Sequence, residues 1–234
     1  MDYMSFIQNN WYIALISFAI AYLLGSINTA VIVTKIATKG KRDIREMGSG
    51  NAGFTNVLRS VGKVPAIFTI VCDLLKAVVA VLLGGVLFSI MNMGNLSPQS
   101  IIMIGEYLCG FFCILGHSYP VYFGFKGGKG IVTAAGMMLV ADWRVFLLIL
   151  GTFLIIFLIS KIISLADIIC ACMFPVYTFL VTFIFDHMMN NRSMMFVVIC
   201  TLAAFGMGLF VVIKHKDNIK RLLKGEEKKI KAKK

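Results

Sequence analysis

Long apolar runs alternate with short polar segments along most of the chain. Six runs are long enough for a helix of about 20 residues, which crosses the roughly 30 Å hydrocarbon core of a bilayer. They lie at about residues 11–34, 64–90, 99–116, 143–160, 164–185 and 193–213. A shorter run near 128–141 needs loop residues 127–130 as its first turn, so its start should lie at or slightly within the membrane surface. The pattern predicts an all-α membrane protein with seven transmembrane helices.

The composition supports this fold class. Of the 234 residues, 59% are apolar and 15% are charged, with a mean hydropathy of +0.88, which is more apolar side chain than one soluble core can bury. No repeat of fixed period divides the chain. We therefore expect one transmembrane domain over residues 1–213 and a basic cytoplasmic tail over 214–234 that contacts anionic lipid.

The first run is expected to remain as a span. No basic segment precedes it, and polar residues between Gly25 and Thr29 replace the pattern of a cleaved signal peptide.

The basic residues predict the orientation. When the spans are threaded alternately, the 23 Lys and Arg residues gather on one side, except Lys76 within a span and Arg144 and Arg192 in loops on the other side. The positive-inside rule makes the basic side cytoplasmic, so the N-terminus lies outside and the C-terminus inside. The net charge of +12 does not indicate nucleic acid, because these cations flank spans and form no basic face interleaved with aromatic residues.

The first cytoplasmic loop, within residues 35–63, is dense in groups that bind anions. Its glycines let the backbone approach a ligand, its Ser, Asn and Thr residues supply neutral hydrogen bonds, and Arg59 can grip a phosphate. An ordinary glycine-rich connector is the alternative, although a connector does not need these polar side chains. The candidate substrate-contacting residues are Ser49, Asn51, Thr55, Asn56 and Arg59.

A second glycine-rich segment enters the fourth helix as Lys126-Gly127-Gly128-Lys129-Gly130. Free N–H groups and the positive end of the helix dipole favour phosphate at a helix N-terminus. The segment is not a Walker A motif, because no strand precedes it and the spacing differs. One such cluster is a weak signal, but two on the same side of a small bundle indicate a phosphate site.

Shorter polar segments complete that face. Ser164 lies between the fifth and sixth spans, and His215 and Asn218 begin the tail. Because His215 and Asn218 are three residues apart on an expected helix, both can face one ligand. For His215, an ordinary interfacial histidine is an equal alternative. We interpret His117 as a residue that caps or orients its loop.

Two charged residues of the second span, Asp73 and Lys76, are three apart and can pair on one helix face. We interpret this pair as structural, and Glu106 and Asp167 as similar acids without a partner. The six cysteines fall within apolar runs and lack the spacing of a zinc site, so no metal and no cofactor are expected.

Motifs that are missing narrow the chemistry. No histidine is followed five residues later by an acid, and no Gly-x-Ser-x-Gly elbow occurs. A site rich in phosphate ligands but poor in general bases suits phosphorylated substrates with a good leaving group.

Together these segments closely resemble the bacterial acyl-phosphate-dependent glycerol-3-phosphate acyltransferases, the PlsY family. The resemblance runs from the first span to about Arg221 and is most specific at residues 48–59, 116–130, 164–165 and 215–218. It implies transfer of a fatty acyl group from acyl phosphate to the 1-hydroxyl of glycerol 3-phosphate, giving lysophosphatidate and phosphate in phospholipid synthesis. It further implies a multi-pass protein of the bacterial cytoplasmic (inner) membrane, with a site facing the cytoplasm and functional coupling to the enzyme that forms acyl phosphate.

The resemblance also assigns residues to substrates. Around glycerol 3-phosphate it places Ser49, Arg59, Lys126, Ser164, His215 and Asn218. Around acyl phosphate it places Thr55, Asn56 and the glycine loop at Gly128 and Gly130. We expect Ser49, His215 and Asn218 to be catalytic through positioning and charge stabilisation, with no obligatory side-chain base and with substrate phosphate accepting the proton.

Three positions depart from the family pattern. Ile27-Asn28 lacks the proline expected after Gly-Ser, Phe54 replaces the usual alanine before Thr-Asn, and Ala166-Asp167 replaces a second serine and adds an acid. Phe54 would narrow the acyl entrance, and Asp167 would shift the affinity for an anionic substrate.

The main alternative is a transporter for an anionic phosphorylated metabolite or lipid, whose path Asp73 and Lys76 would line. The odd number of spans, the lack of inverted repeats and the gathering of polar motifs at one surface argue against it. A structural or lipid-binding subunit is a third alternative, but it would not need two phosphate loops.

Overall fold

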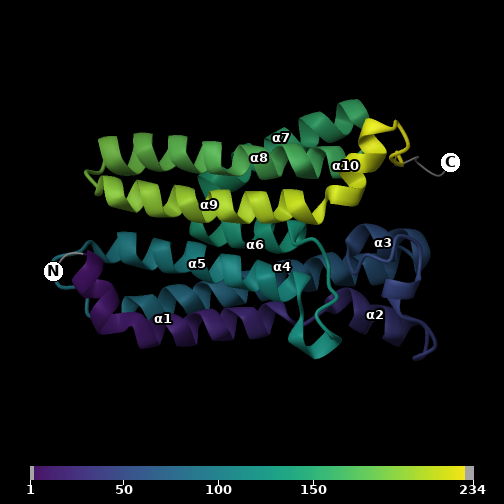
Figure 1. Cartoon of the computed structure of the whole chain (residues 1–234), viewed down its shortest axis with the longest axis horizontal. Helices are drawn as coiled ribbons and strands as arrows, with labels where there is room; N and C mark the ends of the chain where they lie inside the picture. The colour runs from purple at the N-terminus through teal and green to yellow at the C-terminus, as the bar shows by residue number, and fades with distance from the viewer. Residues whose placement is uncertain (1–2, 230–234) are drawn as a thin grey trace. The chain divides into compact units, whose positions relative to one another are not determined.

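The computed structural model describes residues 3–229, and every regular element in that range is helical, which confirms the all-α part of the predicted fold class (Figure 1). The elements in chain order are α1 (Tyr3–Gly25), α2 (Thr29–Ala37), η1 (Ile44–Glu46), α3 (Phe54–Ser60), α4 (Lys63–Ser89), α5 (Pro98–Ser118), η2 (Val121–Phe123), α6 (Ile131–Ala141), α7 (Trp143–Ser160), α8 (Ile163–Val181), η3 (Thr182–Met188), α9 (Met194–Lys214) and α10 (Lys216–Leu223). Two compact units form, unit 1 over Met1–Ala141 and unit 2 over Asp142–Lys234.

Six helical stretches within the described residues are long and apolar enough to cross a membrane. They are Tyr3–Ala37, Lys63–Ser89, Pro98–Phe123, Trp143–Ser160, Ile163–Met188 and Met194–Lys214. They coincide with the six long apolar runs of the sequence, so this part of the prediction is confirmed. The seventh run forms α6, an apolar helix of only 11 residues. That α6 crosses the membrane stays a prediction, and so does the orientation of the chain.

The first apolar run folds as two helices instead of one continuous span. α1 ends at Gly25 and α2 begins at Thr29, with Asn28 as the N-cap whose side chain accepts a hydrogen bond from the Val31 N–H at 3.2 Å. An N-cap side chain satisfies an N–H group that has no partner within the helix. Asn28 therefore helps to start a new helix here without the proline expected after Gly-Ser.

Helices α1, α4, α5 and α6 pack against one another in unit 1. α1 and α5 approach each other through a reciprocal pair of glycines. A Cβ atom at Gly25 would overlap the carbonyl oxygen of Cys113, and a Cβ atom at Gly116 would overlap that of Tyr22. Small residues allow this close packing between apolar helices. The contact fixes the last turn of α5, which carries His117.

Helices α7, α8 and α9 pack together in unit 2, and α10 follows α9 (Figure 1). Arg144 binds Asp142 and Asp186 at 2.8 Å each, and Arg192 lies 3.3 Å from Asp186. Arg144 was predicted to lie in a loop, but it lies in the first turn of α7. The helix begins here because Asp142 caps it and accepts a hydrogen bond from the Arg144 N–H. These ion pairs tie the start of α7 to the end of η3.

The predicted tail begins as an ordered helix, α10. Residues 230–234 of that tail lie outside the described residues. The division into a membrane domain over 1–213 and a tail over 214–234 stays a prediction.

Candidate active site

The first loop is held in shape by the side chain of Asn56, in the first turn of α3. Its amide nitrogen lies within hydrogen-bond distance of three carbonyl oxygens, those of Ile44 (3.1 Å), Met47 (2.9 Å) and Asn51 (3.0 Å). Its amide oxygen accepts a hydrogen bond from the Ser49 N–H at 3.1 Å. Asn56 is buried, so its amide already serves the backbone of its own loop. The sequence did not predict this structural role.

Ser49 lies at the exposed tip of the loop, between two glycines in the left-handed region. Gly48 has a φ of +56° and Gly50 a φ of +70°, values that residues with a side chain rarely adopt. A Cβ atom at Gly48 would also overlap the Asn56 amide oxygen. The glycines therefore hold Ser49 at the surface.

The remaining candidates of this loop lie on or next to α3. Asn51 and Thr55 are half-buried, and Arg59 is exposed in the last turn of the helix. The structure thus brings the five first-loop candidates together on one short segment.

The third loop comprises residues 119–130, between α5 and α6. Its glycine-rich segment packs against His117. The Gly128 N–H donates a hydrogen bond to the His117 carbonyl oxygen at 3.1 Å. A Cβ atom at Gly127 would overlap that oxygen, and one at Gly128 would overlap the ring nitrogen Nε2 of His117. Gly130 has a φ of +85° immediately before α6. Packing alone therefore requires glycine at 127 and 128, whatever ligand the loop binds.

The first and third loops lie against each other within unit 1. A Cβ atom at Gly128 would come within 2.6 Å of the Ala52 carbonyl oxygen in the first loop. In addition, the Arg45 Nη1 atom donates to the Phe123 carbonyl oxygen at 2.6 Å. The structure thus brings the two predicted phosphate loops together.

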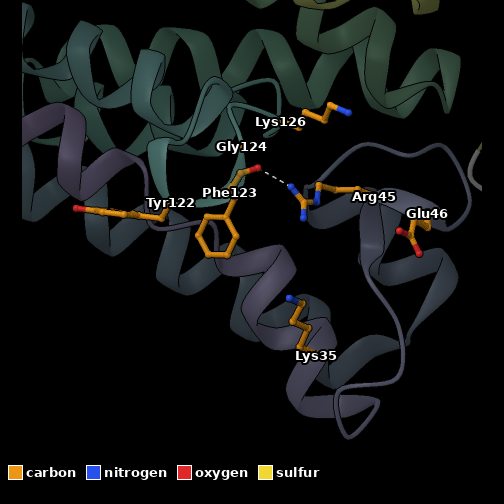
Figure 2. A pocket seen from close by; sticks show the side chains of 7 residues that line it. All are labelled: Lys35, Arg45, Glu46, Tyr122, Phe123, Gly124 and Lys126. Atoms are coloured by element: carbon orange, nitrogen blue, oxygen red, sulfur yellow. Dashed lines mark hydrogen bonds between the residues drawn. The ribbon is translucent and has the colours of Figure 1, made fainter.

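A cavity of about 650 Å³ opens beside this contact, with several cationic side chains in its lining (Figure 2). The lining residues are Lys35, Arg45, Glu46, Tyr122, Phe123, Gly124 and Lys126. Figure 2 shows Lys35 extending from α2 toward Arg45, whereas Tyr122 points away. Lys126 is the one predicted substrate residue among these lining residues. Lys35 and Arg45 were not among the predicted substrate residues, because no local motif marks them as cavity residues.

Asp43 holds the Arg45 side chain in place. The Arg45 Nε atom lies 3.0 Å from Oδ1 of Asp43, and Nη2 lies 2.7 Å from Oδ2. The hydrogen bond from Arg45 holds the pKa of Asp43 below its ordinary value, so this carboxyl is charged near neutral pH. The paired Arg45 therefore acts as an anchor for the third loop, through the Phe123 carbonyl.

A buried group of charged and polar side chains lies behind the glycine loop. Lys76 Nζ lies 2.9 Å from Asp73 Oδ1 and donates to the Ile27 carbonyl oxygen at 2.8 Å. The Thr29 hydroxyl donates to Asp73 at 2.8 Å. The predicted Asp73–Lys76 pair is confirmed, and it ties α4 to the break between α1 and α2.

His117 connects this buried group to the glycine loop. Its Nδ1 atom lies 3.0 Å from Lys76 Nζ. Because an ammonium group only donates, Nδ1 accepts, and the other ring nitrogen lies beside Gly128. The predicted role of His117 in orienting its loop is confirmed by this arrangement.

In unit 2, two predicted residues share one carboxylate. The Ser164 Oγ atom and the Asn218 Nδ2 atom each lie 2.8 Å from Oε1 of Glu227, and Arg221 Nε lies 2.6 Å from Oε2. Burial acts to raise the pKa of Glu227, but hydrogen bonds from Arg221, Ser164 and Asn218 outweigh it and hold the pKa below the ordinary value. Glu227 was not among the predicted site residues, because it lies in the segment that was predicted to be a basic tail.

His215 is buried at the junction of α9 and α10. Its Nδ1 atom lies 2.8 Å from the Val211 carbonyl oxygen, and its Nε2 atom lies 3.5 Å from Oδ2 of Asp167. Two expectations are wrong here. Asp167 has the imidazole of His215 as a neighbour, and His215 does not share a continuous helix with Asn218, because α9 ends before His215 and α10 begins after it.

The predicted residues fall into one group in each unit. Unit 1 carries Ser49, Asn51, Thr55, Asn56, Arg59, Lys126, Gly127, Gly128, Lys129 and Gly130, whereas unit 2 carries Ser164, His215 and Asn218. That both groups serve one site stays a prediction. Over residues 3–229, no three His, Cys, Asp or Glu side chains are grouped to hold a metal ion.

Known proteins resemble the chain over nearly its full length. The family model described as glycerol-3-phosphate acyltransferase matches residues 15–225. A glycerol-3-phosphate acyltransferase of Hydrogenovibrio crunogenus is 38% identical over 219 residues, which are 94% of this chain and 92% of the relative. One from Trichormus variabilis is 37% identical over 218 residues, covering 90% and 89%.

Two solved structures of PlsY, an integral membrane glycerol 3-phosphate acyltransferase, share the fold. The glycerol 3-phosphate form has a TM-score of 0.72 at 32% identity and covers 93% of this chain and 96% of that chain. The lysophosphatidic acid form has a TM-score of 0.71 at 32% identity, with 93% and 95% covered. Together with the six apolar helical stretches, these matches identify an integral membrane protein. The chain belongs to the glycerol-3-phosphate acyltransferase family.

Proposed function

We propose that this protein transfers a fatty acyl group from acyl phosphate to the 1-hydroxyl of glycerol 3-phosphate, giving lysophosphatidate and inorganic phosphate. The observation that carries the proposal is the contact between two polar glycine loops in unit 1, at Gly128 and Ala52, in a chain of this family. Relatives bear the name glycerol-3-phosphate acyltransferase, and PlsY has been solved in glycerol 3-phosphate and lysophosphatidic acid forms.

The acyl donor is the finer part of the proposal. An acyl phosphate is a mixed anhydride whose phosphate leaves readily, so the attacking hydroxyl needs little help from a general base. A new ester C–O bond forms as the acyl C–O bond to phosphate breaks, and the hydroxyl proton passes to a substrate phosphate oxygen. This donor fits a chain in which the acid of the His-x-x-x-x-Asp motif and the Gly-x-Ser-x-Gly elbow are absent from the sequence.

Two phosphorylated substrates repel each other, so the protein must supply cations and N–H donors to both. We propose that Ser49, Arg59, Lys126, Ser164, His215 and Asn218 bind glycerol 3-phosphate. Thr55, Asn56 and residues 127–130 would bind acyl phosphate, with Asn51 and Lys129 nearby in the same loops. Because the Asn56 amide is used by its own loop, it would contribute through the shape of that loop. Catalysis then rests on positioning by Ser49, His215 and Asn218 and on charge stabilisation.

The proposed topology has seven crossings of the bacterial inner membrane. The N-terminus lies outside, and the site faces the cytoplasm. The 11 residues of α6 span about 16 Å at 1.5 Å per residue, which is about half of the hydrocarbon core. A crossing at α6 therefore requires the preceding glycine loop to lie within the membrane surface. That depth would place the loop near a donor that partitions into lipid, and it favours delivery by a membrane-associated enzyme that forms acyl phosphate.

A defined assay tests the function. Purified protein in micelles receives labelled glycerol 3-phosphate and palmitoyl phosphate, and we expect labelled lysophosphatidate, with activity retained in a chelator. Equal rates with acyl-CoA or acyl carrier protein would contradict the donor assignment. A transporter would instead accumulate labelled glycerol 3-phosphate inside proteoliposomes without making the lipid product.

A further inference from the structure

The segment after α10 folds back onto its own unit and places a carboxylate on residues assigned to substrate. α10 ends at Leu223, Gly225 turns the chain with a φ of +70°, and the Glu226 N–H donates to the Arg221 carbonyl oxygen at 2.8 Å. Glu227 then points back toward α10 and the first turn of α8, where Ser164 lies. The reversal is short, so Glu227 is kept at high local concentration next to these groups.

Three donors of different kinds converge on the Glu227 carboxylate. They are the Ser164 hydroxyl at 2.8 Å, the Asn218 amide at 2.8 Å and the Arg221 guanidinium at 2.6 Å. The Glu227 side chain is 9% exposed, whereas that of Arg221 is 42% exposed. A hydroxyl, an amide and a guanidinium around one anion form a set that suits a phosphate oxygen as well as a carboxylate.

The Ser164 hydroxyl cannot serve two anions at once. A serine hydroxyl has one proton to donate, and here that proton points to Glu227. A substrate phosphate at the same donors would also stand next to a charged carboxylate, and like charges at contact distance repel. The Glu227 contact and a phosphate contact at Ser164 are therefore mutually exclusive, and charge repulsion opposes a phosphate at Asn218 while the carboxylate stays there.

We propose that Glu227 is an internal competitor for the anionic acceptor substrate. In the absence of substrate its carboxylate occupies Ser164 and Asn218, and it leaves when the phosphate of glycerol 3-phosphate binds, so Glu227 sets the affinity for that substrate. This inference rests on the proposed function in one respect, namely that Ser164 and Asn218 contact glycerol 3-phosphate.

The size of the effect follows from the fraction of molecules in which the contact is made. If Glu227 occupies the donors in about nine of ten molecules, the apparent affinity for glycerol 3-phosphate is reduced about tenfold. Removing the carboxylate therefore increases the apparent affinity for glycerol 3-phosphate by the same factor. The rate at saturating substrate does not change, because the competitor is then displaced.

The kinetic test compares Glu227→Ala and Glu227→Gln with Glu226→Ala in the full-length chain. Glu226 is the exposed neighbour of the same charge, and it contacts α10 through its backbone N–H. We expect the KM for glycerol 3-phosphate to fall about tenfold in Glu227→Ala and less in Glu227→Gln, with kcat unchanged and with Glu226→Ala like the parent. An unchanged or increased KM in Glu227→Ala overturns the proposal.

A second test does not depend on activity. Trypsin cleavage after Lys224 reports release of the segment, and we expect glycerol 3-phosphate to accelerate it in the parent chain, whereas glycerol has no effect. In Glu227→Ala cleavage should be fast from the start and insensitive to glycerol 3-phosphate. If the parent makes no lysophosphatidate, the proposed function fails, and this cleavage result still decides whether an anion displaces Glu227. Cleavage that is slow and unresponsive in both proteins overturns the proposal.

Discussion

The ring nitrogen Nε2 of His215 faces the carboxylate oxygen Oδ2 of Asp167 across 3.5 Å. The other ring nitrogen must donate to the Val211 carbonyl oxygen at 2.8 Å, because a carbonyl only accepts. In a neutral His215 ring, Nε2 therefore carries a lone pair that points at a carboxylate, which is repulsive. The two side chains should therefore be treated as one unit.

Replacing Asp167 with asparagine tests this relationship. The amide can donate to Nε2 of His215, and a negative charge near the proposed acceptor site is removed. We predict that the KM for glycerol 3-phosphate falls about threefold in Asp167→Asn, as expected for loss of one partly screened repulsion. Steady-state kinetics at saturating palmitoyl phosphate measures the change. Asp217→Asn, at an exposed acid of α10, is the matched control, and an equal fall there would mean that only overall charge matters.

Gly128 is predicted to tolerate no side chain. A Cβ atom there would overlap the His117 ring and approach the Ala52 carbonyl oxygen, so Gly128→Ala must displace the loop. A displacement of about 1 Å at a catalytic loop costs on the order of a hundredfold in kcat/KM. Gly151→Ala is the matched control, because a Cβ atom at Gly151 meets no other atom within 4 Å. Activity that is similar in both variants would show that the glycine loop does not take part in the reaction.

The buried pair of Asp73 and Lys76 is predicted to be structural. Lys76→Met leaves the Asp73 carboxylate buried without its cation, which destabilises a protein by about 3–5 kcal/mol. The double variant Asp73→Asn with Lys76→Met removes both charges and should recover much of this loss. Thermal unfolding in detergent measures both. A larger loss in the double variant than in Lys76→Met would contradict the role of an ion pair.

Asn56 is predicted to be needed for its donor group. Asn56→Ala frees three backbone carbonyls of the first loop, and Asn56→Asp restores the acceptor but supplies no N–H group. Both variants should lose about a hundredfold in kcat/KM if the loop shape positions the substrate. Asn95→Ala, at an exposed loop asparagine, provides the control. Full activity in Asn56→Asp would show that only the amide oxygen matters.

The Glu227 contact has a definite pH dependence. Hydrogen bonds lower the pKa of this carboxyl below its ordinary value of 4.5 despite burial. A lowered pKa means that the contact is fully present above pH 4.5 and is lost as the pH falls through the lowered value. Carbon-13 NMR of labelled glutamate carboxyls should therefore give a Glu227 midpoint below 4.5. In Arg221→Ala the midpoint should rise, because the burial remains while the strongest hydrogen bond is gone.

The sequence predicted those features that depend on local pattern. Apolar runs predicted the six long helical stretches, and i,i+3 spacing predicted the Asp73–Lys76 pair, because both depend on residues close in the chain. The glycine loops were found for the same reason. Features that join distant segments were not found. Examples are the hydrogen bond from Arg45 to Phe123 and the contact of Glu227 with Ser164.

Two errors remain, one at a helix end and one between residues far apart in the chain. His215 was placed on the same helix as Asn218, since no proline or glycine marks the end of α9 at that point. Asp167 was interpreted as unpartnered because its neighbour is more than 40 residues away in the chain. Neither relationship has a periodic signal in the sequence.

The reciprocal glycines of α1 and α5 allow these helices only one register. If α5 slid by one turn along α1, side chains would be driven into the carbonyl oxygens that Gly25 and Gly116 now face. The two helices therefore keep a fixed position relative to each other. If the proposed donor binds in unit 1, we expect the movement that admits it to arise in α2, α3 and the third loop.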